Sequence, residues 1–320
     1  MQRLLLRFLY VVAALRYPVV RRDLRYFVRD NYFCRLNQLR FVANDYVAKK
    51  SYKIIDYQGE FDQELRYVLP FAYWHHLNGT LKETISCTNT KPFYFFSENH
   101  REQYQKRVWQ AGYDYYDVPN MTHSPTFDFA KWTRVPLKSH YKNEVFVFDK
   151  PLLVIANKYN VEWDRPPVNF LDIPALERII ATFGATYQII YNRPLPAQIV
   201  GDNSETLDLN EHEWLRNSHP DVLLMNDLYE QHRTRIPGFN HLQLMVYANC
   251  ERFISMHGGT AALASYFGGV NVILSHPGGG LEHDFNEYAT IFPALSGATI
   301  LHAKNTDEVF AHTESHFFPS

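Results

Sequence analysis

The stretch FISMHGGTAALASYFGGVNVILSHPGGG, residues 253–280, carries the most specific pattern in the chain. It predicts a short strand, a tight His-Gly-Gly turn, a helix of small residues, a second strand and a second glycine-rich turn. Strand–helix–strand order is typical of parallel sheets. The glycines put bare backbone at a helix N-terminus, where unpaired amides and the helix dipole favour an anion. The alternative is that these glycines only turn the chain.

The second half of the chain extends the same pattern. Asp172 is the expected N-cap of the first helix, and Gly184 is expected to end it. The repeated order predicts a parallel sheet with helices on both faces, beginning near Lys150. The expected strands span residues 151–159, 186–194, 221–227, 252–256, 270–275 and 298–304, and the expected helices span residues 172–184, 240–250 and 260–269.

The first half contains a shorter α/β pattern. A strand is predicted over residues 52–58, and a helix over residues 63–79 that ends at Asn78-Gly79. A second strand is predicted over residues 91–97. Residues 119–136 are rich in turn formers, which indicates an interdomain segment or an active-site loop.

Composition and charge exclude several classes of protein. Hydrophobic residues make up 46% of the 320 residues and charged residues 21%, which is typical of a globular protein and not of a disordered one. Three widely spaced cysteines form neither a metal-binding spacing nor a disulfide framework, so a reducing cytoplasm is expected. No G-x-G-x-x-G opens a first βαβ unit, which disfavours a dehydrogenase.

The basic residues are concentrated at the N-terminus. Residues 1–50 hold 11 Lys or Arg and 3 Asp or Glu, a net charge of +8, whereas the remainder holds 21 basic and 31 acidic residues, a net of −10. The acidic body disfavours nucleic-acid binding. The longest uncharged run near the N-terminus, residues 8–15, is too short to span a bilayer. Residues 1–30 predict either an amphipathic helix on an anionic membrane surface or a helix packed on the body with solvated arginines.

Polar side chains follow the strands of the second half at the points where the strands are expected to end. Because the carboxyl ends of parallel strands share one edge of a sheet, these groups are expected to converge there on an anionic ligand such as a nucleotide. Thr260 is expected to cap its helix or donate to phosphate, and Glu282 to contact ribose hydroxyls. The candidate binding residues are Asn157, Lys158, Asn192, Arg193, Asn226, Asp227, His257, Gly258, Gly259, Thr260, Gly279, Gly280, Glu282 and His283.

Residues 242–269, LQLMVYANCERFISMHGGTAALASYFGG, followed by a strand and a glycine-rich loop, resemble the donor-binding half of GT-B-type nucleotide-sugar glycosyltransferases that build bacterial or viral surface glycans. The turn GEFDQEL, residues 59–65, resembles their acceptor-side loop. The resemblance covers residues 52–310. It implies two Rossmann-like domains with parallel sheets facing a central cleft, an acceptor-side domain at 51–148 and a donor-binding domain at 149–320, with the basic segment 1–50 outside both.

The implied activity is transfer of a hexosyl or pentosyl group from a nucleoside-diphosphate sugar, the co-substrate, to a glycan or glycoprotein acceptor, without a further cofactor. The cysteine pattern and the basic N-terminus, rather than the resemblance, predict a cytoplasmic protein, with peripheral membrane contact through residues 1–30 as one of the two interpretations of that segment. The chain lacks the Asp-x-Asp that holds a divalent cation in the other glycosyltransferase architecture, and its histidines lack metal spacing, so no metal site is expected. Lys158 and Arg193 are expected to neutralise the diphosphate instead.

An inverting transfer needs a base that deprotonates the acceptor hydroxyl. Asp62 is the favoured catalytic base and Glu60 the alternative, because both lie in the turn after the first strand and are expected to face the interdomain cleft. Glu98 and His100 are second candidates. Asp62 as a simple helix cap is the competing interpretation, and a retaining mechanism would not need this base. Two other functions stay open: a sugar-nucleotide 2-epimerase on the same fold, and a non-catalytic nucleotide- or glycan-binding module.

Overall fold

The computed structural model describes residues 2–108, 117–122, 124–162, 166–195, 198, 204–276 and 287–318. The strands described are β1 Lys53–Asp56, β2 Leu81–Cys87, β3 His100–Tyr104, β4 Leu152–Ala156, β5 Asn160–Glu162, β6 Gln188–Asn192, β7 Ser204–Thr206, β8 Leu223–Leu224, β9 Arg252–Met256, β10 Val270–Leu274 and β11 Thr299–Ala303. The helices are α1 Gln2–Arg16, α2 Arg25–Gln38, η1 Leu39–Phe41, η2 Ala43–Ala48, α3 Phe61–Gln63, η3 Glu64–Val68, α4 Leu69–Leu77, α5 Leu137–Tyr141, α6 Ile173–Phe183, α7 Glu211–Ser218, α8 Met225–His232, α9 Phe239–Ala248, α10 Gly259–Ser265, α11 Glu287–Ser296 and α12 Thr306–His316.

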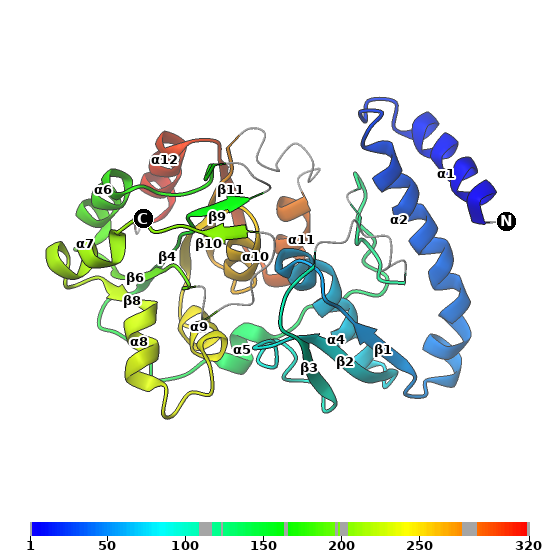
Figure 1. Ribbon diagram of the computed structural model, residues 1–320, viewed down its shortest axis with the longest axis horizontal. Helices are drawn as coiled ribbons and strands as arrows, with labels where there is room; N and C mark the ends of the chain where they lie inside the picture. Colours follow the sequence, from blue (N-terminus) through cyan, green and yellow to red (C-terminus); the bar gives the residue numbers. More distant parts are fainter. Residues whose placement is uncertain are drawn as a thin grey trace.

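Two parallel sheets organise the molecule into an α/β fold (Figure 1). The smaller sheet has three strands in the order β1-β2-β3, and the larger has six in the order β11-β10-β9-β4-β6-β8. The short strands β5 and β7 form a separate antiparallel pair. This arrangement is consistent with two Rossmann-like domains.

The predicted strands of the larger sheet are confirmed, except that one of them is much shorter than expected. β4, β9 and β10 are almost fully buried apolar runs, as expected for central strands covered on both faces. Asp172 caps α6 as predicted, because its side chain accepts a hydrogen bond from the Ala175 amide. The strand predicted over residues 221–227 is reduced to β8, because Met225 already begins α8 and points with Leu228 into the core.

In the first half, the β1 strand and the helix after it are confirmed, but the strand predicted over residues 91–97 is wrong. That segment forms consecutive turns, in which the Phe93 amide bonds to the Thr90 carbonyl and the Tyr94 amide to the Lys91 carbonyl. The turns bury Phe93, Tyr94 and Phe96 together, without the alternation that a strand needs. The second and third strands are instead β2 and β3. β3 is an edge strand with mostly exposed side chains, so it lacks an apolar pattern.

The order in which the chain adds strands to the larger sheet reverses between β4 and β9. The chain runs outward from β4 through β6 to β8, then returns to the other side of β4 with β9 and continues through β10 to β11. β4 and β9 pair in register from Leu153–Arg252 to Ala156–Ser255. Their carboxyl ends are therefore neighbours at the point of the sheet where ligands collect in open α/β folds.

The two sheets share one hydrophobic core on their facing sides. This core joins Leu65 and Val68 of η3 to Ala261 and Ala264 of α10. The Tyr266 hydroxyl, just after α10, donates to the carbonyl of Leu65. A second apolar cluster, which includes side chains of α6 and α12, covers the opposite face of the six-stranded sheet. The contact between α10 and the helix α3–η3 therefore fixes the two α/β units against each other.

The N-terminal helices belong partly to the body of the protein. α1 packs against α2, and α2 is attached to residues 117–131, where the Thr122 hydroxyl donates to the Phe27 carbonyl at 2.9 Å. Asp45 of η2 is fully buried, pairs with the Lys131 ammonium and accepts from the Tyr52 hydroxyl at 2.5 Å. Among the described residues, no helix has the length and apolarity needed to cross a membrane.

We expect the substitution Asp45→Asn to lower the free energy of unfolding by about 3–5 kcal/mol, because it leaves the Lys131 charge buried without its carboxylate. The matched control is Asp23→Asn in the same segment. Asp23 pairs with Arg21 at the surface, where an ion pair contributes little. Urea denaturation of both variants measures the difference, and equal losses would contradict the anchoring role of Asp45.

Candidate functional site

Two of the predicted strand-end groups meet at the β4–β9 switch point. Lys158 follows β4, and the His257-Gly258 turn follows β9. The Lys158 ammonium nitrogen lies 3.7 Å from the position that a Cβ on Gly258 would take. Gly258 has φ 107° and ψ −151°, a backbone conformation that strongly favours glycine. A half-buried cation therefore stands beside a glycine turn, as the sequence predicts.

The next glycine meets the other α/β unit. A Cβ on Gly259 would lie 2.9 Å from Cδ1 of Phe61 in α3. Phe61 is itself held in place, with the Arg107 guanidinium 5.0 Å from its ring centroid and the Phe93 ring 5.3 Å away edge-on. Glycine is thus required at position 259 for close packing by Phe61. The sequence instead predicts that a ligand approaches the backbone here, so Phe61 takes the place expected for the ligand at this position.

Thr260 and His257 have local partners as well. The Thr260 hydroxyl donates to the Met256 carbonyl at 2.5 Å, so it satisfies backbone at the end of β9. The His257 amide bonds to the Leu274 carbonyl at 3.0 Å, and its ring lies 5.2 Å from the ring of Tyr288. These contacts attach the turn to β9, β10 and Tyr288.

A buried arginine connects the two units beside this turn. The Arg66 side chain is 2% exposed and pairs with Asp62, one helical turn away, and at 2.7 Å with Glu287 of α11. The Tyr67 hydroxyl also donates to Glu287, and the Ser124 amide contacts the other oxygen of Glu287 at 3.2 Å. Burial alone would lower the pKa of Arg66, but the neighbouring acidic groups raise it well above its ordinary value.

Tyr288 links this ion-pair cluster to the glycine turn. Its hydroxyl lies 2.6 Å from a carboxylate oxygen of Asp62 and 3.0 Å from the carbonyl of Gly258, so its one proton can serve either acceptor. Asp62, from the first unit, and Gly258, from the second, therefore share one hydrogen-bonding partner. The sequence predicts only that Asp62 faces the interdomain cleft. In the structure, the Tyr288 hydroxyl lies within hydrogen-bond distance of both Asp62 and the Gly258 carbonyl.

The helix segment that carries Arg66 has an unusual geometry. η3 is π-helical, a form that is frequent at functional sites. It also carries the buried Glu64, which accepts from Arg107 at 2.7 Å and from Tyr94 at 2.8 Å. Arg107 in turn donates to the carbonyl of Gly59 at 2.8 Å. This second buried ion pair holds the turn at residues 59–60 against the helix.

The four candidate bases differ in what they contact. Asp62 is 16% exposed, and its two oxygens accept from Arg66 and Tyr288. Glu60 is half-buried at the N-cap of α3, where its side chain makes no capping bond. Glu98 is exposed. Both ring nitrogens of His100 lie within hydrogen-bond distance of threonine hydroxyls, at 2.9 and 3.1 Å, and burial lowers its pKa.

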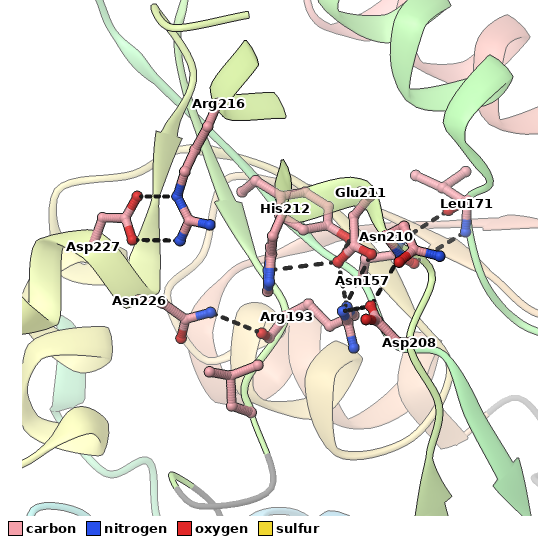
Figure 2. A network of polar contacts seen from close by, with 12 residues as sticks. Asn157, Leu171, Arg193, Asp208, Asn210, Glu211, His212, Arg216, Asn226 and Asp227 are labelled. Atoms are coloured by element: carbon pink, nitrogen blue, oxygen red, sulfur yellow. Dashed lines mark hydrogen bonds and ion pairs between the residues drawn. The ribbon is translucent and has the colours of Figure 1, made fainter. Parts of the chain in front are cut away.

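The other strand-end residues of the larger sheet bind protein groups. The Asn157 amide donates to the Leu171 carbonyl at 2.9 Å and to the Tyr191 hydroxyl at 3.0 Å (Figure 2). The Asn192 amide donates to Gln243 and Tyr247 at 2.6 and 2.7 Å. Both asparagines are buried, and their side-chain N–H groups bond to protein atoms, whereas the side-chain oxygen of Asn192 is buried without a hydrogen-bond partner.

Arg193 is held in a buried ion pair. Its guanidinium contacts both oxygens of Glu211, which is fully buried, and Asp208 at 3.5 Å (Figure 2). Burial lowers the pKa of Arg193, but the hydrogen bond and charge of Glu211, together with Tyr191 and Asp208, outweigh burial, so the net shift is upward. The predicted partners Asn226 and Asp227 lie in α8, where Asn226 bonds to the Arg193 carbonyl and Asp227 pairs with Arg216 at the surface.

The remaining predicted binding residues, Gly279, Gly280, Glu282 and His283, lie outside the described residues. Within the described ranges, no group of three or more His, Cys, Asp or Glu side chains is placed to hold a metal ion. A pocket of about 380 Å³ lies along the edge strand β1, and Asp117 and Val118 also line it. Among the described residues, none of the predicted site residues lines this pocket.

Sequence reasoning missed Arg66, Glu287, Tyr288 and Phe61. One signal was available, because Arg66 interrupts a stretch that is otherwise apolar from Leu65 to Ala72, and Glu64 directly precedes it. Charged residues at core-facing positions of a helix are rarely buried unless they are paired. Their partners lie far away in the sequence, and no local pattern indicates them. Comparisons with protein-family models, curated proteins and solved structures gave no match.

We expect the substitution Arg66→Met to lower the free energy of unfolding by about 3–5 kcal/mol, because two buried carboxylates would lose their shared cation. Arg101→Met is the matched control. Arg101 pairs with Glu83 at 3.0 Å, but its side chain is 56% exposed, so its loss changes stability little. Denaturant titration followed by tryptophan fluorescence compares the two variants. An Arg66→Met protein as stable as the control would show that the bridge does not hold the units together.

Proposed function

We propose that the protein is a glycosyltransferase that binds a nucleoside-diphosphate sugar at the β4–β9 switch point. One observation carries the proposal: Lys158 and the Gly258 turn lie together at adjacent carboxyl strand ends, and Asp62 of the other α/β unit reaches the same turn through Tyr288. Open α/β sheets bind nucleotides at this position. A two-substrate reaction also needs groups from a second unit there.

The donor would be held chiefly by Lys158 and by backbone amides of the glycine turn. An ammonium group and backbone amides can stabilise the negative charge that builds up on the leaving diphosphate. Arg193 forms an ion pair with Glu211 away from the turn, so in this proposal it holds the strand ends in place, and Lys158, beside the Gly258 turn, contacts the diphosphate. The proposal keeps a GT-B-like arrangement, with residues 51–148 on the acceptor side and metal-independent chemistry.

Glu60 and Asp62 remain the proposed bases for an inverting transfer. An acceptor proton moving to Asp62 would have to compete with the hydrogen bonds from Arg66 and Tyr288. The Glu60 carboxylate lies in the same turn, which Arg107 holds through the Gly59 carbonyl. The contacts of Asp62 give it a role in orienting Arg66 and Tyr288. We therefore propose Glu60, the alternative in the sequence prediction, as the base to test first.

The donor site is tested by a thermal-shift screen against UDP, GDP, CMP and dTDP sugars. A ligand at about 100 times its dissociation constant stabilises the fold by about 2.7 kcal/mol. For the sugar nucleotide that binds, we expect Lys158→Met to weaken binding at least about tenfold, because a charge-assisted hydrogen bond contributes about 1.5–3 kcal/mol. Calorimetric titration measures the affinity.

Lys150→Met is the control for this titration. Lys150 precedes β4 and donates to the Gly184 carbonyl, so it lies at the opposite end of the strand that Lys158 follows. We expect its substitution to leave the affinity unchanged. Equal affinities in the two variants would remove Lys158 from the site, and failure of every sugar nucleotide to bind would sink the proposed donor class.

The base is tested by acceptor-dependent release of nucleoside diphosphate. We expect Glu60→Gln to reduce turnover by about 10²–10⁴-fold with donor affinity unchanged, because a positioned general base contributes that much. Glu144→Gln, a change of the same kind on an exposed side chain outside the candidate site, is expected to leave turnover unchanged. NMR of the product is expected to show inversion at the anomeric carbon.

Other outcomes discriminate among functions. Retention of configuration would make the inverting base unnecessary. Conversion of the sugar nucleotide without an acceptor would indicate a 2-epimerase, and tight binding without turnover in any acceptor screen would indicate a binding module.

A further inference from the structure

The first helix stands at the edge of the molecule. α1 packs on α2 through Leu9 and Ala13, which are 6% and 0% exposed, and in Figure 1 it is the outermost element on the right. α2 and η2 are tied to the body by the contacts of Phe27 and Asp45. α1 is therefore a surface element attached along one face only.

The opposite face of α1 is apolar and exposed. Leu4, Phe8 and Leu15 are 69%, 63% and 78% exposed, and Val11 between them is 54% exposed. At 3.6 residues per turn these four side chains lie within an arc of about 60°, away from Leu9 and Ala13. A helix that only packs on its own protein directs polar residues outward. α1 instead has two apolar faces, and packing on α2 explains only one of them.

Exposed apolar side chains are concentrated in this part of the protein. Ten of the nineteen exposed large hydrophobic residues in the described chain lie within residues 2–50. The others are spread over the remaining described residues. Scattered exposed apolar residues are ordinary, whereas a gathered set marks a binding surface.

The charge around this face is positive. No acidic residue precedes Asp23, while Arg3 and Arg7 are exposed beside the apolar stripe. Of the three acidic residues in the first 50, Asp30 and Asp45 are buried. Because these two negative charges are buried, the exposed surface of residues 1–50 is more positive than the formal net charge of +8 indicates. The combination of an apolar stripe and flanking arginines fits the boundary between acyl chains and anionic headgroups.

We propose that α1 docks the protein on an anionic membrane surface, with Leu4, Phe8, Val11 and Leu15 in the headgroup–acyl boundary and Arg3 and Arg7 beside lipid phosphates. Charge favours this occupant over a second copy of the chain, because a dimer through α1 would bring two strongly basic segments together. The proposal concerns a surface apart from the β4–β9 switch point and holds whatever reaction the protein performs.

Sedimentation of the full chain with vesicles tests the proposal. We expect binding to vesicles of phosphatidylcholine mixed with phosphatidylglycerol, weaker binding at high salt, and little binding to phosphatidylcholine alone. The double variant Phe8→Ser/Leu15→Ser is expected to lower the vesicle partition coefficient by at least about tenfold, because two exposed apolar side chains no longer enter the bilayer. Both positions are exposed, so the variant is expected to fold, which circular dichroism checks.

The control is Val145→Ser/Val147→Ser, which removes two exposed apolar side chains, each 56% exposed, from the body. It is expected to bind vesicles like the wild type. A folded Phe8→Ser/Leu15→Ser protein that binds as well as the control would overturn the proposal, as would equal binding to neutral and anionic vesicles. Light scattering that shows a dimer lost in this variant, without vesicle binding by the wild type, would assign the face to self-association instead.

Discussion

The buried guanidinium of Arg66 is the constraint on which the rest of the structure depends. It takes one carboxylate from its own helix, Asp62, and one from α11, Glu287, 221 residues away in the chain. A charge this deeply buried is tolerated only when its partners are in place. The position of α11 relative to η3 is therefore fixed, and Tyr288, the next residue of α11, is brought between Asp62 and the Gly258 turn.

The same constraint accounts for the close packing between α10 of one unit and α3 and η3 of the other. Phe61 fills the space above Gly259, and α10 lies on η3 through small residues such as Ala261 and Ala264. Small side chains let the helices approach closely, which brings the strand-end groups of one unit within reach of the other. A ligand at the β4–β9 switch point would thus meet a preformed turn and a preformed ion-pair cluster. Preorganised polar groups are the main source of electrostatic catalysis in enzymes.

The larger sheet could be predicted because β4, β9 and β10 are buried on both faces, so each strand is a continuous apolar run. The pairing of Lys158 with the Gly258 turn followed from that topology. The strand predicted over residues 91–97 failed because adjacent aromatic residues can be buried by turns as well as by a strand. Arg66 could not be assigned from sequence, because its role depends on Glu287, whose position only the tertiary fold determines. For the same reason, the sequence does not indicate that the side chains of Asn157 and Arg193 bond to other groups of the protein.

The central claim is that a nucleoside-diphosphate sugar binds at the β4–β9 switch point and that its binding also stabilises α3 and η3 of the other α/β unit. Amide hydrogen exchange with and without a saturating sugar nucleotide tests it most directly. The account predicts slower exchange in residues 257–262 and 158–159, and also in residues 60–66, because Tyr288 and Phe61 couple the glycine turn to α3 and η3. Protection confined to the pocket along β1, or to any other region that leaves residues 257–262 unchanged, would contradict it.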